Sequence, residues 1–439
     1  MKKFSKELSK LSSKTKKVLF EISEIASERN EPVFLVGGFA RDLLLRAANP
    51  AAFGSYGASF DIDCVVEGDS AELAKELSRR LKADGITINQ KFQTAKIQLA
   101  NFAVDIASAR SEVYSSDGKL PDVTRGKMEE DAVRRDFTVN ALYISINKSD
   151  FGLLCSRKDY LEDLKKGLLR VFHKRSFYDD PTRIFRAVRF AARFNFKIEP
   201  VTKKYLKNAL RDGVLKKISS FRLKRELFLL LKEPDVSKQV SLLFSLGINK
   251  ALLNGVSKKV IPDLKTAQDL WLDFFIYFHE KINTPLFFLL VVFGNAPLRI
   301  RRRISEKLAL TFPEKRALTF SKNTLEKIKN HIRKNLPDWP ALLAETPFEI
   351  ILFVAFLLKK ESGDKERPQK KVFEYLLHLR FKKPFHTSRE LIRMGFPDRK
   401  IGKIRELLLT ERLENRSASK TEEYRFLQSS AFLKKITSS

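Results

Sequence analysis

The chain has 439 residues, 43% of them hydrophobic, which is enough to bury two or more separate cores. It carries 84 Lys and Arg against 53 Asp and Glu, and the formal charge of +31 favours a polyanionic partner, nucleic acid rather than a membrane surface. Its two cysteines, Cys64 and Cys155, exclude a disulfide framework and a cysteine-rich zinc site.

The longest apolar runs lie at residues 285–293 and 347–358. Both are shorter than the roughly 18 residues that a membrane-spanning helix needs, so we expect buried helices and no membrane association. The basic N-terminal segment, residues 1–17, has neither the apolar core nor the small-residue cleavage site of a secretion signal. A cytoplasmic location is therefore expected.

Short β-branched runs and helical segments alternate through residues 31–150, which predicts a mixed α and β region. Residues 69–82 are typical of a helix that begins at an Asp or Ser cap. From about residue 160 onward, apolar residues recur at spacings of three and four, so the remainder is predicted to be all-helical. The expected strands lie at residues 33–37, 59–66, 91–99, 102–107 and 137–146.

Two aspartates, Asp61 and Asp63, occupy alternate positions in the expected strand 59–66. Side chains at i and i+2 of a strand share a face, so the two carboxylates repel each other unless a cation lies between them. Magnesium fits because it prefers hard oxygen ligands and takes few protein carboxylates. Asp105, on the expected strand 102–107, could bring a third carboxylate to the same place. A solvated edge or turn is the plainer interpretation of an isolated Asp-x-Asp pattern.

Gly37 and Gly38 follow the first expected strand and precede Arg41 in the segment VGGFARDLLL. Glycines let backbone amides approach a ligand closely, and a following helix N-terminus favours anions. A nucleotide triphosphate is therefore expected here, with Arg41 neutralising it. A triphosphate beside metal-binding carboxylates is the arrangement of phosphoryl transfer, in which two metals activate the attacking hydroxyl and stabilise the leaving pyrophosphate.

Two later segments place arginines beside aspartates. Arg134, Arg135 and Asp136 begin an expected strand. Asp180 and Pro181 make a good helix start in any protein, as N-cap and first helical residue. The arginines that follow recur every three residues and form one cationic helix face, either functional or merely solvated; they are Arg183, Arg186 and Arg189.

Five segments in this order resemble motifs of the bacterial, class II nucleotidyltransferases, a family that includes CCA-adding tRNA nucleotidyltransferases and bacterial poly(A) polymerases. They are VGGFARD, DIDCVV, DIASARSEVY, EEDAVRRDFTVNAL and DDPTRIFRAVRFAARF. The similarity is dense over residues 33–235 and returns weakly at residues 386–404. Residues 46–60 separate the first two motifs by more chain than the family pattern has, and are expected to form a surface loop.

The resemblance implies an α+β fold, in which a DNA-polymerase-beta-like nucleotidyltransferase head is followed by an all-α neck, body and tail. On this basis we expect an N-terminal helical extension over residues 1–30 and the head, or palm, over 31–150. A helical neck with a base-reading helix is expected over 151–235, and a helical, RNA-binding body and tail over 236–439.

Site residues are implied by the same resemblance, position by position. Asp61 and Asp63 are expected to bind catalytic Mg²⁺, with Asp105 as a candidate third catalytic carboxylate. Asp180 and Arg183 match the pair that reads the incoming base. The other residues expected to bind the nucleotide are Gly37, Gly38, Arg41, Arg134, Arg135, Asp136, Arg186 and Arg189.

The base-reading role has a physical basis. Cytosine and adenine both offer an exocyclic amino donor next to an unprotonated ring nitrogen, which suits one carboxylate acceptor beside one guanidinium donor. Uracil and guanine present the reversed pattern, and two unsatisfied buried contacts would discriminate against them by roughly a hundredfold or more.

The implied function is template-independent addition of C, A or both from CTP and ATP to the 3′ end of tRNA, with the acceptor arm as RNA partner. The segment 91–114 favours tRNA, whereas the high positive charge favours the alternative, poly(A) tailing of varied RNA. A non-catalytic RNA-binding protein is an alternative of another class, but it leaves the aligned carboxylates without a role. The RNA surface is expected to include Arg299, Arg301, Arg302 and Arg303.

Overall fold

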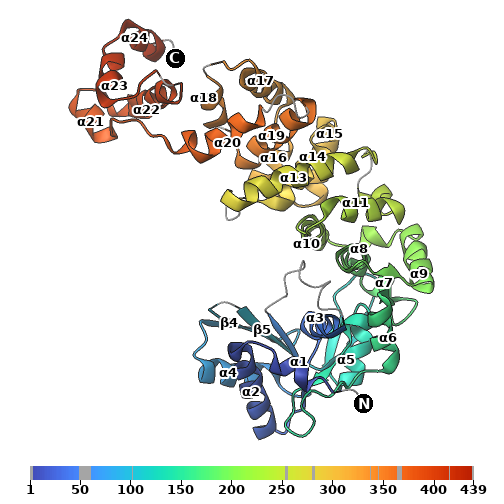
Figure 1. The fold of residues 1–439 in the computed structure, drawn as a ribbon. Coiled ribbons are helices and arrows are strands. Elements are labelled where there is room, and N and C mark those ends of the chain that lie inside the picture. The colour runs from blue at the N-terminus through green and yellow to red at the C-terminus, as the bar shows by residue number, and fades with distance from the viewer. Residues whose placement is uncertain are drawn as a thin grey trace. The chain divides into compact units, whose positions relative to one another are not determined.

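The fold consists of two compact units in a computed structural model of the chain. The first unit contains Met1–Glu226 and Leu242–Ala251, and the second contains Leu227–Ser241 and Leu252–Ser439. The first is mixed α and β and the second is helical, so the predicted α+β fold class is confirmed (Figure 1). The residues that the structure describes are 3–48, 61–100, 102–252, 256–278, 282–336, 338–344, 346–362, 368–414 and 416–437.

A six-stranded sheet forms the centre of the first unit (Figure 1). Its order is β3 (Gly85–Asn89), β4 (Thr94–Leu99), β5 (Phe102–Ser108), β2 (Ile62–Val66), β1 (Val33–Leu35) and β8 (Ile144–Ser145). Only β2 and β5 pair in parallel among these neighbours, with Asp63 opposite Asp105. The alternation of the pleat leaves Asp63 half-buried while Ile62 and Cys64 are fully buried on the opposite face.

Helix α4 (Ser70–Leu81) confirms the helix predicted at 69–82. The side chain of Asp69 accepts hydrogen bonds from the amides of Ala71 and Glu72 at 2.9 and 3.2 Å, so it acts as the expected N-cap. Leu73 and Leu77 are fully buried because this face of α4 packs on the sheet. The N-terminal helices are α1 (Ser5–Ser9) and α2 (Ser13–Glu28), and α2 packs against α4.

The predicted strand at 137–146 is mostly wrong. Thr138–Asn140 form a 3₁₀ turn, η1, and only the short strand β8 follows it. The carboxylate of Asp136 accepts hydrogen bonds from the amide of Phe137 and from Asn140 Nδ2, both at 2.9 Å. This local bonding replaces a strand ladder, while the apolar residues that suggested a strand are buried all the same.

Five described strands of the first unit were not predicted. One is β3 at the edge of the sheet, and two form an antiparallel pair of their own, β6 (Arg110–Val113) and β7 (Asp122–Arg125). The last two, β9 (Leu168–Leu169) and β10 (Lys197–Ile198), pair in parallel, so the prediction of an all-helical remainder from about residue 160 is wrong at these short strands. The remaining described α-helices of this unit are α3 (Gly37–Ala48), α5 (Met128–Arg134), α6 (Lys158–Lys166), α7 (Ser176–Asp179), α8 (Thr182–Phe194), α9 (Pro200–Arg211) and most of α12 (Asn249–Leu252). The residues of α10 (Ser220–Leu231) and α11 (Val236–Ser245) are divided between the two units. Residues 46–48 close α3, and the rest of the expected surface loop, 49–60, lies outside the described residues.

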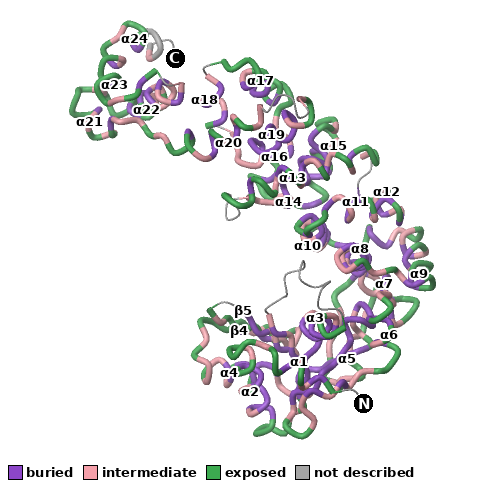
Figure 2. Tube along the Cα trace, viewed as in Figure 1, coloured by how far each residue is buried: buried purple, intermediate pink, exposed green. Residues whose placement is uncertain are grey.

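The second unit is built from helices around two apolar ones, α14 (Thr284–Phe293) and α19 (Phe348–Ser362). Both expected apolar runs are thus buried helices, as predicted, and they pack against each other (Figure 2). Among the described helices, none combines the length and apolar character needed to cross a bilayer. The others are α13 (Val260–Phe278), α15 (Leu298–Lys307), α16 (Phe312–Leu318), α17 (Lys322–Arg333), α18 (Trp339–Ala344), α20 (Gln369–Leu377), α21 (Ser388–Arg393), α22 (Asp398–Leu413), α23 (Lys420–Leu427) and α24 (Ser430–Thr437).

Candidate active site

A cavity of about 720 Å³ opens in the first unit and gathers most of the predicted nucleotide site. Two of the predicted catalytic and nucleotide-binding residues, Asp61 and Arg189, do not line this cavity. The predicted residues on its wall are Gly37, Gly38, Arg41, Asp63, Asp105, Arg134, Arg135, Asp136, Asp180, Arg183 and Arg186. Residues that contribute to the wall but were not predicted include Lys96, Glu112, Tyr114, Asn140 and Phe190.

The three candidate catalytic carboxylates lie on neighbouring strands. Asp63 and Asp105 are register partners on β2 and β5, and Asp61 directly precedes β2. Asp61 Oδ1 accepts a hydrogen bond from the amide of Ala103 at 2.8 Å, so it is anchored to the start of β5. Lys96 Nζ lies 2.9 Å from Asp105 Oδ2. The predicted meeting of Asp105 with the Asp-x-Asp pair therefore occurs in the fold.

The electrostatics of the pair call for a cation. Burial raises the pKa of Asp63, and the charge of Asp105 raises it further. Hydrogen bonds from two backbone amides offset only part of this effect. Carboxylate oxygens with uncompensated charge are the ligands that Mg²⁺ prefers, so the donor set fits a divalent metal. Among the described residues, no group of three or more acidic, His or Cys side chains is already clustered around a metal position.

The double glycine turns the chain beside Asp63. Gly37 has φ of +66°, and a Cβ built on it would lie 3.2 Å from Asp63 Oδ2. The amides of Gly38 and Phe39 donate to Asp63 Oδ2 at 3.1 and 3.4 Å. Glycine is thus required for the close approach of this backbone to the carboxylate. Sequence reasoning expected the glycine amides near the triphosphate. In this structure the amide of Gly38, together with that of Phe39, binds the Asp63 carboxylate instead.

Arg41 is buried at the wall of the cavity rather than extended into it. Its guanidinium forms an ion pair with Asp42 at 2.7 Å and donates to Asn140 Oδ1 at 2.8 Å. It also stacks over the ring of Phe194, 4.4 Å from the centroid. Arg41 therefore already has a full set of partners, and Asn140, whose amide also bonds Asp136, ties it to the next motif.

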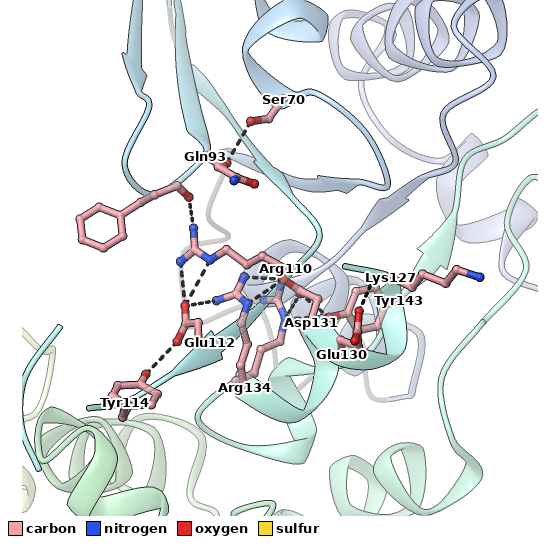
Figure 3. Close-up of polar contacts among 12 residues, drawn as sticks. Ser70, Gln93, Arg110, Glu112, Tyr114, Lys127, Glu130, Asp131, Arg134 and Tyr143 are labelled. Atoms are coloured by element: carbon pink, nitrogen blue, oxygen red, sulfur yellow. Dashed lines mark hydrogen bonds and ion pairs between the residues drawn. The ribbon is translucent and has the colours of Figure 1, made fainter. Parts of the chain in front are cut away.

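A buried charge network holds the arginines of the segment EEDAVRRDFTVNAL in place (Figure 3). Asp131, with 0% exposure, accepts from Arg134 Nε at 2.8 Å, from Arg135 Nη2 at 2.7 Å and from the Tyr143 hydroxyl at 2.5 Å. Burial opposes the charged form, yet Arg135 and Arg134 together lower the pKa of Asp131 to about 2. Sequence reasoning missed Asp131, although its i+3 and i+4 spacing to two arginines was a usable signal.

Glu112 extends the network toward the cavity (Figure 3). Its Oε1 accepts from Arg110 Nη2 at 2.9 Å and from Arg134 Nη1 at 3.1 Å, and its Oε2 accepts from the Tyr114 hydroxyl at 2.7 Å. Burial and the charge of Glu112 raise the pKa of Tyr114, so this hydroxyl stays protonated and donates. Glu112 lies on the unpredicted strand β6, within the segment DIASARSEVY, but sequence reasoning did not single it out as a site residue.

Asp136 and Arg186 form a close ion pair, with Arg186 Nε 2.6 Å from Asp136 Oδ2. The charge of Asp136 raises the pKa of Arg186, although burial acts in the opposite sense. Arg186 therefore keeps its charge at the cavity wall. Two of the predicted nucleotide residues hold each other in place by this contact, although they come from different motifs.

Asp180 and Arg183 both reach the cavity but bond to other groups. Asp180 Oδ1 accepts from the amide of Thr182 at 3.0 Å and from Arg222 Nη2 at 2.6 Å. Arg183, which is 4% exposed, donates to Ser176 Oγ at 2.7 Å and to the carbonyl of Arg134 at 2.5 Å. The predicted N-cap is off by one position, because α8 begins at Thr182 with Pro181 as its N-cap, although the Asp180 carboxylate still accepts from the amide of Thr182.

Two predicted arginines have different surroundings from those expected. Arg189 Nη1 lies 3.8 Å from Glu226 Oε2 and outside the cavity wall. Arg301 is 4% exposed and donates to the carbonyls of Leu318 and Phe320 at 3.0 and 2.8 Å. The prediction that Arg301 contacts RNA is therefore wrong, because α15 turns it inward. Its predicted neighbours on α15 remain exposed: Arg299, Arg302 and Arg303.

Two family models match this chain. The poly A polymerase head domain matches residues 33–170, and the probable RNA and SrmB-binding site of polymerase A matches residues 195–259. The A-adding tRNA nucleotidyltransferase of Aquifex aeolicus is 31% identical over 84% of the chain, and that of Geobacter sulfurreducens is 30% identical over 93%. These matches show similarity to poly(A) polymerase domains and, over most of the chain, to A-adding tRNA nucleotidyltransferases.

A solved structure is similar to this chain over nearly the full length of both chains, whereas the chain matches less than half of each of these two curated relatives. The Thermotoga maritima CCA-adding enzyme complexed with tRNA is 27% identical, with a TM-score of 0.69 over 98% of this chain and 99% of that one. The chain spans 43% and 46% of the length of the Aquifex and Geobacter relatives. These relatives are tRNA nucleotidyltransferases by name, and the carboxylates Asp63 and Asp105 on the cavity wall are oxygen ligands of the kind that a divalent metal takes.

The buried network predicts how acid destabilises the protein. Because the pKa of Asp131 is lowered to about 2, its charge stabilises the fold above the unfolded value of about 3.9 and loses this effect as pH falls toward 2. The loss is on the order of 2 kcal/mol. We expect urea unfolding between pH 5 and pH 3 to show a shallower decline in Asp131→Asn, which is also less stable at pH 7 by about 3–5 kcal/mol. Asp122→Asn, an exposed control, keeps the wild-type slope; equal slopes in wild type and Asp131→Asn would contradict this account.

Proposed function

We propose that this chain is a template-independent RNA nucleotidyltransferase that adds A, C or both from ATP and CTP to the 3′ end of tRNA, in the cytoplasm. The observation that carries the proposal is the meeting of paired carboxylates, Asp63 and Asp105, with Asp180 and Arg183 on one cavity. A non-catalytic RNA-binding protein has no use for this arrangement. The A-adding names of both curated relatives favour ATP and tRNA over poly(A) tailing.

The proposed metal is Mg²⁺, held by Asp61 and Asp63 with Asp105 beside them. When bound there, it would supply Lewis-acid activation of the RNA 3′-hydroxyl and charge stabilisation of the leaving pyrophosphate. In the reaction, a bond forms between the 3′ oxygen and the α-phosphorus, and the bond from the α-phosphorus to the oxygen bridging the β-phosphorus breaks. The amides of Gly38 and Phe39 orient Asp63 for this role.

The basic wall of the cavity is proposed to hold the nucleotide's sugar and phosphates. Arg134 and Arg135 are fixed from behind by Asp131, and Arg186 by Asp136. Their planar guanidinium groups remain charged at any physiological pH and suit phosphate oxygens. These residues need little rearrangement to present positive charge to a triphosphate.

Base selection is proposed to rest on Asp180 and Arg183. One carboxylate acceptor and one guanidinium donor match the shared edge of adenine and cytosine, as argued from the sequence. Asp180 Oδ1 is committed to Thr182 and Arg222, and no hydrogen bond to Oδ2 is present among the described residues. The second oxygen is therefore the acceptor proposed to receive the base amino group.

The proposed function is tested with tRNA ending at the discriminator base, at C and at CC, each given ATP or CTP alone. We expect addition of a single A to the CC end if the chain is A-adding, stepwise CCA if it is CCA-adding, and long A tracts if it tails RNA. Asp63→Asn should lower incorporation by about 1,000-fold, because metal stabilisation contributes several kcal/mol. Asp122→Asn serves as the matched carboxylate control. Wild-type rates in Asp63→Asn would remove Asp63 from catalysis.

Asp180→Asn tests the base reader separately from the helix cap. Asparagine caps helices about as well, so the melting temperature should change little. Its neutral amide can turn a donor toward a carbonyl, so the ratio of kcat/KM for UTP to that for ATP should rise by roughly 10- to 100-fold. Asp179→Asn, which alters the adjacent carboxylate outside the cavity wall, should leave the ratio unchanged. Unaltered selectivity in Asp180→Asn would mean that Asp180 stabilises the start of α8 and does not read the base.

The exposed arginines of α15 are proposed to contact the tRNA backbone. Arg302→Glu with Arg303→Glu should weaken tRNA binding and flatten the dependence of log Kd on log salt, because two phosphate contacts are lost. ATP binding should be unaffected. Lys165→Glu with Lys166→Glu, two exposed positions on α6 outside the segment that matches the RNA-binding model, changes the net charge equally and serves as control. Equal weakening in both double variants would attribute RNA binding to overall charge instead of to α15.

A further inference from the structure

Lys96 stands opposite the candidate metal ligands and has no assigned role. It lies on β4, where it is the antiparallel register partner of Asp105, which is in turn the parallel partner of Asp63. One cation and two carboxylates thus lie in a row across three adjacent strands. All three side chains belong to residues that line the cavity.

The contact between Lys96 and Asp105 uses both carboxylate oxygens. Lys96 Nζ lies 2.9 Å from Oδ2 and 3.3 Å from Oδ1. An ammonium in this position covers the oxygens that a metal ion would need. The hydrogen bond to Asp105 raises the pKa of Lys96, and the charges of Asp61 and Asp63 add to the effect, so the ammonium lies in the field of all three carboxylates.

The pair is held loosely enough to separate. The side chain of Lys96 is 48% exposed and that of Asp105 is 43% exposed, so water can replace either partner at small cost. Lysine is a compact charge on a flexible stem, and it can leave the carboxylate without moving the backbone. By contrast, Asp63 is fixed by two backbone amides and stays where it is.

We propose that Lys96 is a displaceable internal cation that occupies Asp105 until a divalent metal binds, and thereby weakens metal binding by the free protein. The inference rests on the proposed function in one respect, that Asp63 and Asp105 belong to the metal site. Lys96 acts through Asp105 and is a positioning residue. The triphosphate of an incoming nucleotide offers the Lys96 ammonium another anion to pair with. The nucleotide and the metal would therefore favour each other's binding.

The test measures binding of Mn²⁺ alone to the full chain, by electron paramagnetic resonance or calorimetry, without nucleotide or RNA. Lys96→Met should bind Mn²⁺ about tenfold more tightly than wild type, because both carboxylate oxygens of Asp105 become available to the metal. Lys96→Arg keeps the ion pair and should bind like wild type. Lys91→Met removes the same charge from an exposed position outside the cavity wall and should also bind like wild type.

A double variant decides whether Lys96 acts through Asp105. In Lys96→Met with Asp105→Asn the gain in Mn²⁺ affinity should disappear, since the freed ligand is gone. Persistence of the gain in this double variant, or a Kd for Lys96→Met within twofold of wild type, would overturn the inference. If neither wild type nor Lys96→Met binds Mn²⁺, the inference is likewise overturned.

Failure of the proposed function has a different signature. Asp63→Asn should abolish Mn²⁺ binding in both the wild-type and the Lys96→Met backgrounds. Unchanged binding in Asp63→Asn would reject the metal site itself, whereas loss of binding in Asp63→Asn with no effect of Lys96→Met would reject only the role of Lys96.

Discussion

Repulsion between Asp63 and Asp105 is the constraint around which the site is built. Parallel pairing of β2 with β5 sets the two carboxylates side by side on one face of the sheet. Burial raises the pKa of Asp63 and the charge of Asp105 raises it further, so the folded protein carries a local cost that a bound cation would remove. The glycine turn at Gly37, the amides of Gly38 and Phe39 and the ammonium of Lys96 each reduce that cost in part.

Most of the remaining charges of the cavity are paired one by one, whereas Arg183 donates to two neutral acceptors, Ser176 Oγ and the carbonyl of Arg134. Arg41 has Asp42, Arg186 has Asp136, and the arginines of α5 have Asp131 and Glu112. A large positive formal charge therefore does not mean unpaired cations at the candidate active site. Specific contacts set the local field there, and the excess charge is available elsewhere for a polyanionic backbone.

Local patterns predicted the features whose causes are local. Period-2 spacing predicted that Asp63 faces away from the buried Ile62 and Cys64, and the helix signals at Asp69 predicted α4, because both depend on neighbours in the chain. The segment 137–146 failed because Asp136 and Asn140 bond their own backbone and each other, which apolar periodicity does not reveal. Glu112 and the inward turn of Arg301 depend on tertiary contacts with residues distant in sequence.

The network behind Asp131 has a consequence for the entropy of ligand binding. A free arginine side chain carries about 2 kcal/mol of rotamer entropy, and a flexible arginine loses much of it when it grips a phosphate. Arg134 and Arg135 lose this freedom when the protein folds, because Asp131, Glu112 and Tyr143 already hold them. Under the proposed function, a nucleotide at this wall would meet arginines that are already ordered, so more of the contact energy would remain for affinity and for discrimination between bases.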